Sequence, residues 1–143
     1  MVAPTSLQAV VIGAGQAGLA VSHARPGRNV TGLSGAFEGI VEKRLQLMKE
    51  IVPAARRFAV LTNPITYGRA QLESYLQKRN VDGILGVQVM VLEARGPDDF
   101  DSTFATMARE RVGAVAVLAD SVFWVHRARL SELCIQYGLP SVW

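Results

Sequence analysis

The sequence predicts an α/β protein with three layers, in which a parallel sheet is covered by helices on both faces. From residue 28 onward, short runs rich in β-branched residues alternate with amphipathic segments of helix length. That alternation is typical of βαβ units, whose strands lie parallel. The runs themselves, such as FAVL at residues 58–61 and VQVMVL at residues 87–92, are almost continuously apolar. Continuous apolar runs indicate strands that are buried on both faces.

The length and charge of the chain narrow the classes of protein to which it can belong. Its 143 residues, 50% hydrophobic and 19% charged, suit one globular domain or one lobe of a larger protein. The formal net charge is +3, but the basic residues are scattered and form no run of five or more. Scattered charge is typical of solvated helix faces, so we expect no nucleic-acid partner.

Five strands are expected from the apolar runs. The last has barely begun where the sequence stops, so the sheet is expected to be cut there. A cut sheet has an open edge and an uncovered apolar face, and both favour self-association. The expected strands are Asn29–Leu33, Arg57–Thr62, Val87–Glu93, Ala114–Leu118 and Ser141–Trp143.

Apolar residues at three- and four-residue spacing predict four helices between and after these strands. In the third, Pro97, Asp98 and Asp99 suit a helix start, because proline lacks the amide that would go unpaired there and carboxylates interact favourably with the helix dipole. The segment NVDGILG at residues 80–86 is irregular, so the end of the second helix is left open. The expected helices span about 35–52, 69–79, 97–108 and 122–137.

The first and last of these helices carry clear apolar stripes that are expected to face the sheet. The first stripe consists of Ile40, Val41, Leu45, Met48, Ile51 and Val52. The last consists of Val122, Val125, His126, Leu130, Leu133 and Cys134. Cys134, the single cysteine of the chain, is therefore expected to pack in the core rather than to act as a reactive thiol.

Gly13, Gly15 and Gly18 follow an apolar run with the spacing of a dinucleotide-binding turn. There, glycines allow a tight bend, close approach of the backbone to a pyrophosphate, and a helix packed on the strand. The usual continuation is missing, because a Pro-Gly pair at residues 26–27 ends the helix early and Ser34 stands where an acidic residue should hold a ribose. Ordinary turn and packing glycines are favoured, and an FAD- or NAD-binding oxidoreductase fragment remains the alternative.

Several short motifs occur in order along the chain. Gly18-Leu19 is followed by ARPG at residues 24–27 and by NVTG at residues 29–32. The match continues through KRL at 43–45, AVLTNP at 59–64, the segment 93–120 and the final LPSVW. Together these motifs resemble those of ABC-transporter substrate-binding proteins with a type I periplasmic-binding fold, in the branch that includes tryptophan- and tyrosine-binding members. The resemblance covers roughly residues 16–143.

The resemblance implies a fold of two lobes, of which the chain contains mainly the second. Residues 1–28 are then expected to be a remnant of the hinge and first-lobe segment. Residues 29–143 are expected to form the second-lobe α/β domain, incomplete at its C-terminus. On this interpretation the chain is truncated at both ends.

The resemblance also implies the function of a solute-binding component of an ABC transporter uptake system. A small molecule, such as an amino acid or another small solute, binds in the cleft between the lobes and is delivered to an ABC permease, without catalysis and without a cofactor. Such proteins are periplasmic or otherwise extracytoplasmic, although the N-terminal residues of this chain carry no export signal. The effector-binding domain of a transcription regulator shares this fold and remains a second alternative.

Ligands of open parallel sheets bind beyond the carboxyl ends of the strands. That rule selects the loops at residues 62–67 and 119–124, which follow two of the expected strands. Each candidate also has a structural explanation: a turn for the Asn-Pro pair, a helix cap for the Asp-Ser pair, and packing for the aromatic rings. The candidate ligand-binding residues from these loops are Asn63, Pro64, Tyr67, Asp120, Ser121 and Phe123. Thr31 and Ser34 border the hinge, where the resemblance implies contact with the ligand.

Catalytic and metal-binding patterns find no support in the sequence. His23 and His126 lie far apart, and neither forms a metal-ligand pattern with Cys134. Neither a nucleophile elbow nor a phosphate-binding Gly-Lys-Ser/Thr loop occurs. We therefore expect a binding protein rather than an enzyme.

Overall fold

The computed structural model describes residues 9–10, 30–31 and 39–143, and the chain divides into two compact units, residues 1–37 and 38–143. In the first unit, strands β1 (Ala9–Val10) and β2 (Val30–Thr31) pair in parallel. Strand β2 lies inside the predicted strand at residues 29–33. The dinucleotide-type glycines Gly13, Gly15 and Gly18 lie outside the described residues.

The last four of the five predicted strands form a parallel sheet in the second unit, whereas β2, within the first predicted strand, pairs with β1 instead. The strands of this sheet are β3 (Arg57–Thr62), β4 (Gln88–Glu93), β5 (Ala114–Val117) and β6 (Ser141–Val142). They are arranged in the order β4-β3-β5-β6, and every neighbouring pair is parallel. The two strands at the centre, β3 and β5, are buried almost along their whole length.

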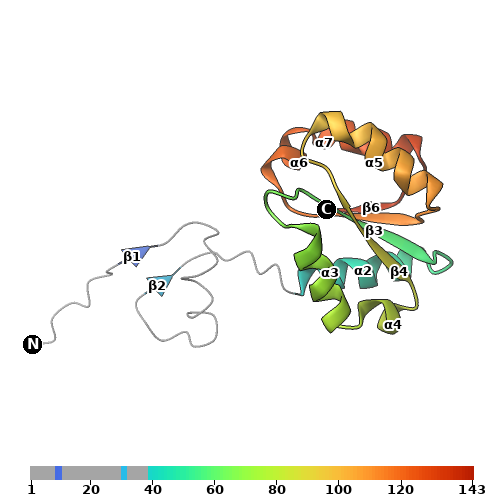
Figure 1. Ribbon diagram of the computed structural model, residues 1–143, viewed down its shortest axis with the longest axis horizontal. Coiled ribbons are helices and arrows are strands. Elements are labelled where there is room, and N and C mark those ends of the chain that lie inside the picture. Colours follow the sequence, from blue (N-terminus) through green and yellow to red (C-terminus); the bar gives the residue numbers. More distant parts are fainter. Residues whose placement is uncertain (1–8, 11–29, 32–38) are drawn as a thin grey trace, which may run out of the picture. The chain divides into compact units, whose positions relative to one another are not determined.

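Helices cover both faces of this sheet and form the outer layers of the predicted three-layer fold (Figure 1). On one side lie α2 (Ile40–Ile51), α3 (Arg69–Lys78) and α4 (Val81–Leu85). On the other side lie α5 (Pro97–Arg109), α6 (Ser121–Val125) and α7 (Arg127–Gln136). Within residues 39–143, no helix combines the length and the apolar character needed to cross a membrane.

The larger core lies between the sheet and helices α5 to α7. Phe100 and Phe104 of α5 are fully buried. The ring centroid of Phe100 lies 6.0 Å from that of Phe123, and the ring centroid of Phe104 lies 5.9 Å from that of Tyr137. Cys134 is buried in the same cluster, as predicted. Strands β3 and β5 contribute Ala59, Leu61, Val115 and Val117.

Helix α2 packs on the opposite face, and its first turn is held by α3. Val41, Leu45 and Met48 are at most 2% exposed. The Tyr75 hydroxyl of α3 accepts a hydrogen bond from the backbone amide of Gly39 at 2.9 Å. Gly39 has φ of 91°, a left-handed conformation that glycine adopts without strain, and it begins the helix.

The apolar stripe predicted to face the sheet on the first helix includes residues that do not face it. Ile40 is 41% exposed and Ile51 is 64% exposed, so neither faces the sheet. Residues with three- and four-residue spacing cover a broad arc of a helix, and the flat sheet contacts the middle of that arc. Of the predicted helix at 35–52, the described part begins at Ile40 and ends at Ile51.

The single helix predicted at 122–137 is wrong, because the structure has two helices joined at His126. His126 has φ of −97° and ψ of 18°, outside the helical region, and its ring makes an edge-on contact with that of Phe100. Val125 is 70% exposed, and Phe123 takes the core position instead. Phe123, His126 and Leu130 keep helical spacing across the break, and therefore periodicity alone does not reveal it.

Two smaller differences concern the segment around β4. The run VQVMVL was expected to be buried on both faces, but in β4 only Val91 is fully buried. The strand lies at one end of the described sheet, where fewer side chains cover it. The irregular segment before it forms the short helix α4, which ends at Gly86 with φ of 62°.

We expect Phe104→Ala to lower the free energy of unfolding by about 3 to 5 kcal/mol, because removing a fully buried ring leaves a cavity. The control is Ile135→Ala on α7, a side chain that is 81% exposed. Its effect should stay within about 0.5 kcal/mol. Urea denaturation followed by circular dichroism measures both, and equal losses would contradict the core position of Phe104.

Candidate functional site

The chain reverses its direction across the sheet between β3 and β5. From β3 it passes to β4 on one side, and it then returns through α5 to β5 on the other side of β3. Connections that leave two neighbouring strands in opposite directions open a crevice at their carboxyl ends, and ligands of such sheets bind there. The two loops selected from the sequence, which follow β3 and β5, flank this point.

Asn63 follows β3 and is 3% exposed. Its side-chain oxygen accepts a hydrogen bond from the backbone amide of Ile65 at 3.0 Å, and its backbone carbonyl accepts from the amides of Thr66 and Tyr67 at 3.0 and 2.9 Å. These bonds build the turn. Its side-chain amide donates to Oδ1 of Asp120, in the loop after β5, at 3.2 Å. Asn63 therefore shapes its own loop and connects it to the loop after β5.

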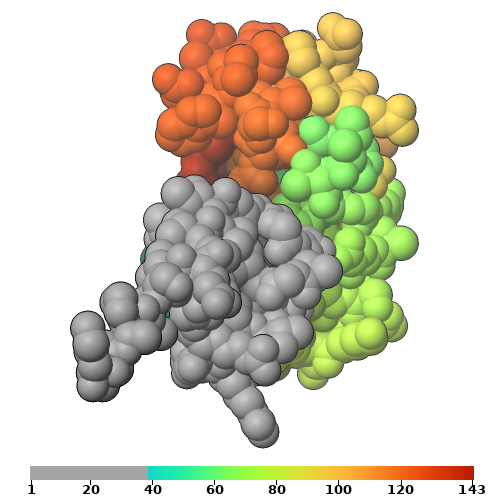
Figure 2. Space-filling model, turned by 90° about the vertical axis from the view of Figure 1, so that its left-hand side faces the viewer, coloured from blue at the N-terminus to red at the C-terminus, as the bar shows by residue number. Residues whose placement is uncertain are grey.

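Asp120 begins helix α6 and receives hydrogen bonds from two directions. Its Oδ1 accepts from the amides of Val122 at 2.8 Å and Phe123 at 3.4 Å, which is a helix N-cap. Its Oδ2 accepts from the hydroxyl of Thr66. We call Asn63, Thr66 and Asp120 the rim clasp, because together they join the two loops. Figure 2 shows the surface of α6 (orange) next to that of the loop after β3 (green).

The rim clasp keeps the Asp120 carboxyl ionised. Burial alone would raise its pKa, but hydrogen bonds from Thr66, Asn63 and the amides of Val122 and Phe123 outweigh burial and lower the pKa below its ordinary value. Oδ2 accepts one hydrogen bond from Thr66 and Oδ1 accepts three. The carboxyl ends of β3 and β5 thus carry a stable negative charge, and its less occupied oxygen is Oδ2.

The other predicted residues differ in their exposure. Ser121 is exposed, and Pro64 and Tyr67 are half-buried beside the clasp. Phe123 is 1% exposed and packs against Phe100, which is the packing explanation considered from the sequence. The side chain of Thr31 and the whole of Ser34 lie outside what the structure describes.

Two residues at this edge were not among the sequence candidates. Thr66 lies inside the selected loop, three residues after Asn63 at the end of the turn. That position in the sequence could have identified it as a partner of Asp120. Arg44 comes from α2, and its Nη1 donates to the carbonyl oxygen of Val117, the last residue of β5, at 3.1 Å. No sequence signal placed a residue of this helix at the end of β5.

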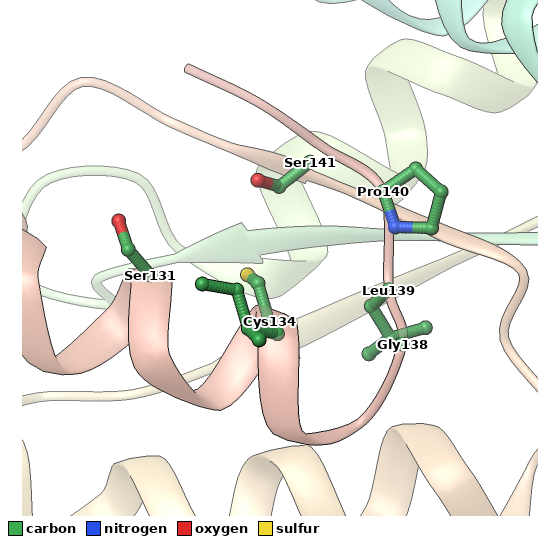
Figure 3. Close-up of a pocket in the computed structure, with 7 residues that line it drawn as sticks. Ser131, Cys134, Gly138, Leu139, Pro140 and Ser141 are labelled. Atoms are coloured by element: carbon green, nitrogen blue, oxygen red, sulfur yellow. The ribbon is translucent and has the colours of Figure 1, made fainter.

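A separate shallow groove of about 370 Å³ lies between the end of α7 and the chain entering β6 (Figure 3). This groove lies at the amino end of β6, and none of its lining residues belongs to the rim clasp. Burial raises the pKa of the Cys134 thiol in this groove, so the thiol stays neutral. The lining residues are Ser131, Cys134, Ile135, Gly138, Leu139, Pro140 and Ser141. In the part of the chain with described positions, no three His, Cys, Asp or Glu side chains gather as metal ligands.

Comparisons with solved structures find similar folds. One is a conserved domain protein from Vibrio cholerae O1 biovar El Tor, with 26% sequence identity and a TM-score of 0.59. A second, with 18% identity and a TM-score of 0.58, is an ABC domain from Streptococcus pneumoniae in complex with L-Trp. A third, with 19% identity and a TM-score of 0.56, is a ligand-free, open substrate-binding protein with adhesive properties from Clostridium difficile.

The matches cover 81%, 81% and 79% of this chain but 38%, 38% and 37% of those chains. This chain therefore corresponds to less than half the length of the solved structures it resembles. Among curated proteins, none matches it. A family model described as ABC transporter substrate binding protein matches residues 2–126, which is most of the sequence. The chain belongs to the family of ABC transporter substrate-binding proteins.

Proposed function

We propose that this chain binds a small solute for an ABC transporter uptake system, at the carboxyl ends of β3 and β5. The observation that carries the proposal is the rim clasp, which fixes two loops and an ionised carboxylate at the point where the sheet connections diverge. Membership of the substrate-binding family supports it. On this proposal the chain has no catalytic role, and its partner is the permease of the transporter.

In this proposal, residues 29–143 form the second lobe of a protein with two lobes, and residues 1–28 are a remnant of the hinge and first lobe. The share of the solved structures that the chain covers is consistent with one lobe. The ligand is then held between two walls, of which the described sheet edge is one. A ligand that contacts both walls stabilises the closed arrangement by its higher affinity for it.

Several groups at this edge can contact the ligand. Oδ2 of Asp120 has room for a second donor, such as an ammonium group, and Ser121 offers an exposed hydroxyl beside it. Pro64 and Tyr67 provide apolar surface. Phe123 packs in the core and supports the start of α6 after the β5 loop. Thr31 and Ser34 are proposed to contact the ligand from the hinge.

An amino acid is the proposed ligand class. It has the ammonium group that Oδ2 of Asp120 can accept, and one similar fold was solved in complex with L-Trp. We propose a periplasmic or other extracytoplasmic location, as the family suggests. Self-association through the exposed edge beside β6 is proposed as a property of the isolated chain.

We expect millimolar L-Trp to shift the backbone amide resonances of residues 63, 65–67 and 118–122 in the 143-residue chain. The reason is that these loops form the proposed wall, while one wall alone binds weakly. Two-dimensional ¹⁵N NMR measures the shifts, with Gly113 and Gly138 at the opposite edge of the sheet as internal controls. Shifts centred on those glycines, or no shifts at all, would contradict the proposed site. A micromolar dissociation constant for L-Trp in calorimetry would contradict the expectation that one wall alone binds weakly.

We expect Asp120→Ala to lower the free energy of unfolding by about 1 to 2 kcal/mol at pH 7, because the variant loses a helix cap and the bond to Thr66. The pKa of Asp120 is lowered on folding, so its contribution is present above the ordinary value of 3.8 and is lost as the pH falls through the folded-state pKa. The gap between wild type and variant should therefore shrink at low pH. Urea denaturation from pH 7 to pH 3 measures it.

The matched control for this variant is Ser121→Ala, which changes the next, exposed residue of the same helix. Its unfolding free energy should stay within about 0.5 kcal/mol of the wild type at every pH. A gap between wild type and Asp120→Ala that is independent of pH would show that the carboxylate is not responsible.

A further inference from the structure

Arg44 lies at the same edge of the sheet as the rim clasp but belongs to a different layer. It is in the second turn of α2, beside the buried residues Val41, Leu45 and Met48. Its Nη1 reaches the carbonyl oxygen of Val117 at 3.1 Å, at the carboxyl end of β5 and three residues before Asp120. The guanidinium therefore lies at the carboxyl end of β5, the end of the sheet at which the ligand is proposed to bind.

The charge of Arg44 has no counter-charge among the described side chains. The residue is half-buried, and burial lowers its pKa. Five other arginines form ion pairs with carboxylates: Arg57, Arg69, Arg79, Arg109 and Arg129. Arg56, Arg95 and Arg111 are exposed to water, and Arg127 lies over the ring of Trp124. Water can solvate this guanidinium while the edge is open, but a ligand that covers it without supplying an anion would leave a costly buried charge, so we expect the ligand to supply the anion.

The bond to Val117 fixes the position of the guanidinium without neutralising it. A guanidinium has five N–H donors, and the contact with Val117 uses one nitrogen, Nη1. Donors that remain in a planar fork match the two oxygens of a carboxylate. The edge at the end of β5 thus carries one anion, Asp120, and one cation, Arg44, each with capacity left for a partner.

We propose that Arg44 binds a carboxylate of the ligand, so that the solutes recognised by this site are carboxylate-bearing and include zwitterions. This inference rests on the function proposed above. It assigns to α2 a direct role in ligand recognition, in addition to its role in covering the sheet.

The test uses the 143-residue chain and three probes that share an indole ring. L-Trp has an ammonium and a carboxylate, indole-3-propionate has the carboxylate alone, and tryptamine has the ammonium alone. Titrations with millimolar probe, followed by ¹⁵N NMR, give a dissociation constant from the backbone amides of residues 63, 65–67 and 118–122. The side-chain Nε–H resonance of Arg44 in the wild type reports contact directly and needs no variant.

The variants are Arg44→Gln, which removes the charge, and Arg44→Lys, which keeps it without the planar fork. The control is Arg56→Gln, which removes the same charge from an exposed residue at the amino end of β3, away from the proposed site. We expect Arg44→Gln to raise the dissociation constants of L-Trp and indole-3-propionate at least about fivefold. The dissociation constant of tryptamine should rise less than about twofold. Arg44→Lys should fall between, and Arg56→Gln should leave all three unchanged.

Three outcomes would overturn the inference. If Arg44→Gln weakens tryptamine as much as the carboxylates, Arg44 acts only on the structure of the edge. If the carboxylate probes bind without moving the Nε–H resonance of Arg44, they bind elsewhere. If L-Trp and indole-3-propionate bind the wild type and Arg44→Gln with equal affinity, the proposed function stands and only the role of Arg44 is removed, whereas if no probe shifts the loop amides of the wild type, the proposed function itself fails.

Discussion

The arrangement of the candidate site depends on one carboxylate that serves a helix and a neighbouring loop at the same time. Asp120 caps the first amides of α6 through Oδ1 and accepts from Thr66 through Oδ2, while the side-chain amide of Asn63, in the loop after β3, donates to Oδ1. Because these donors favour the charged form, the carboxyl remains ionised despite its partial burial. The same hydrogen bonds therefore set both the arrangement of the two loops and the charge between them.

The small residues of β5 explain how a second charge reaches this edge. Strand residues alternate between faces, and Val115 and Val117 point into the core with α5 and α7. Ala114 and Ala116 point to the other face, where α2 packs against β5. Alanine side chains allow a helix to approach closely, and Arg44 can then extend from α2 to the carbonyl of Val117. Packing of the core and placement of the guanidinium thus have a common cause.

Sequence patterns predicted the fold well where a single physical signal dominated. Apolar β-branched runs located β3 and β5, and the Pro-Asp-Asp start located α5, because burial and helix-end electrostatics are local effects. The break at His126 was missed, since Phe123 and Leu130 keep helical spacing on both sides of it. Asn63 and Asp120 were selected by the strand-end rule, but Arg44 was not, because its place depends on packing between α2 and a strand about seventy residues later.

If the proposed function holds, the incomplete pairing of Asp120 and Arg44 gives the site a physical basis for selectivity. In an open edge, water can solvate both groups, and their spare hydrogen-bonding capacity costs little. When a ligand covers the edge, water is excluded, and any group left without a partner becomes a buried, unsatisfied charge. A solute that lacks the matching group therefore loses more than one contact, because it also leaves the protein's charge unpaired. Discrimination of this kind comes from the penalty on the wrong solute as much as from attraction of the right one.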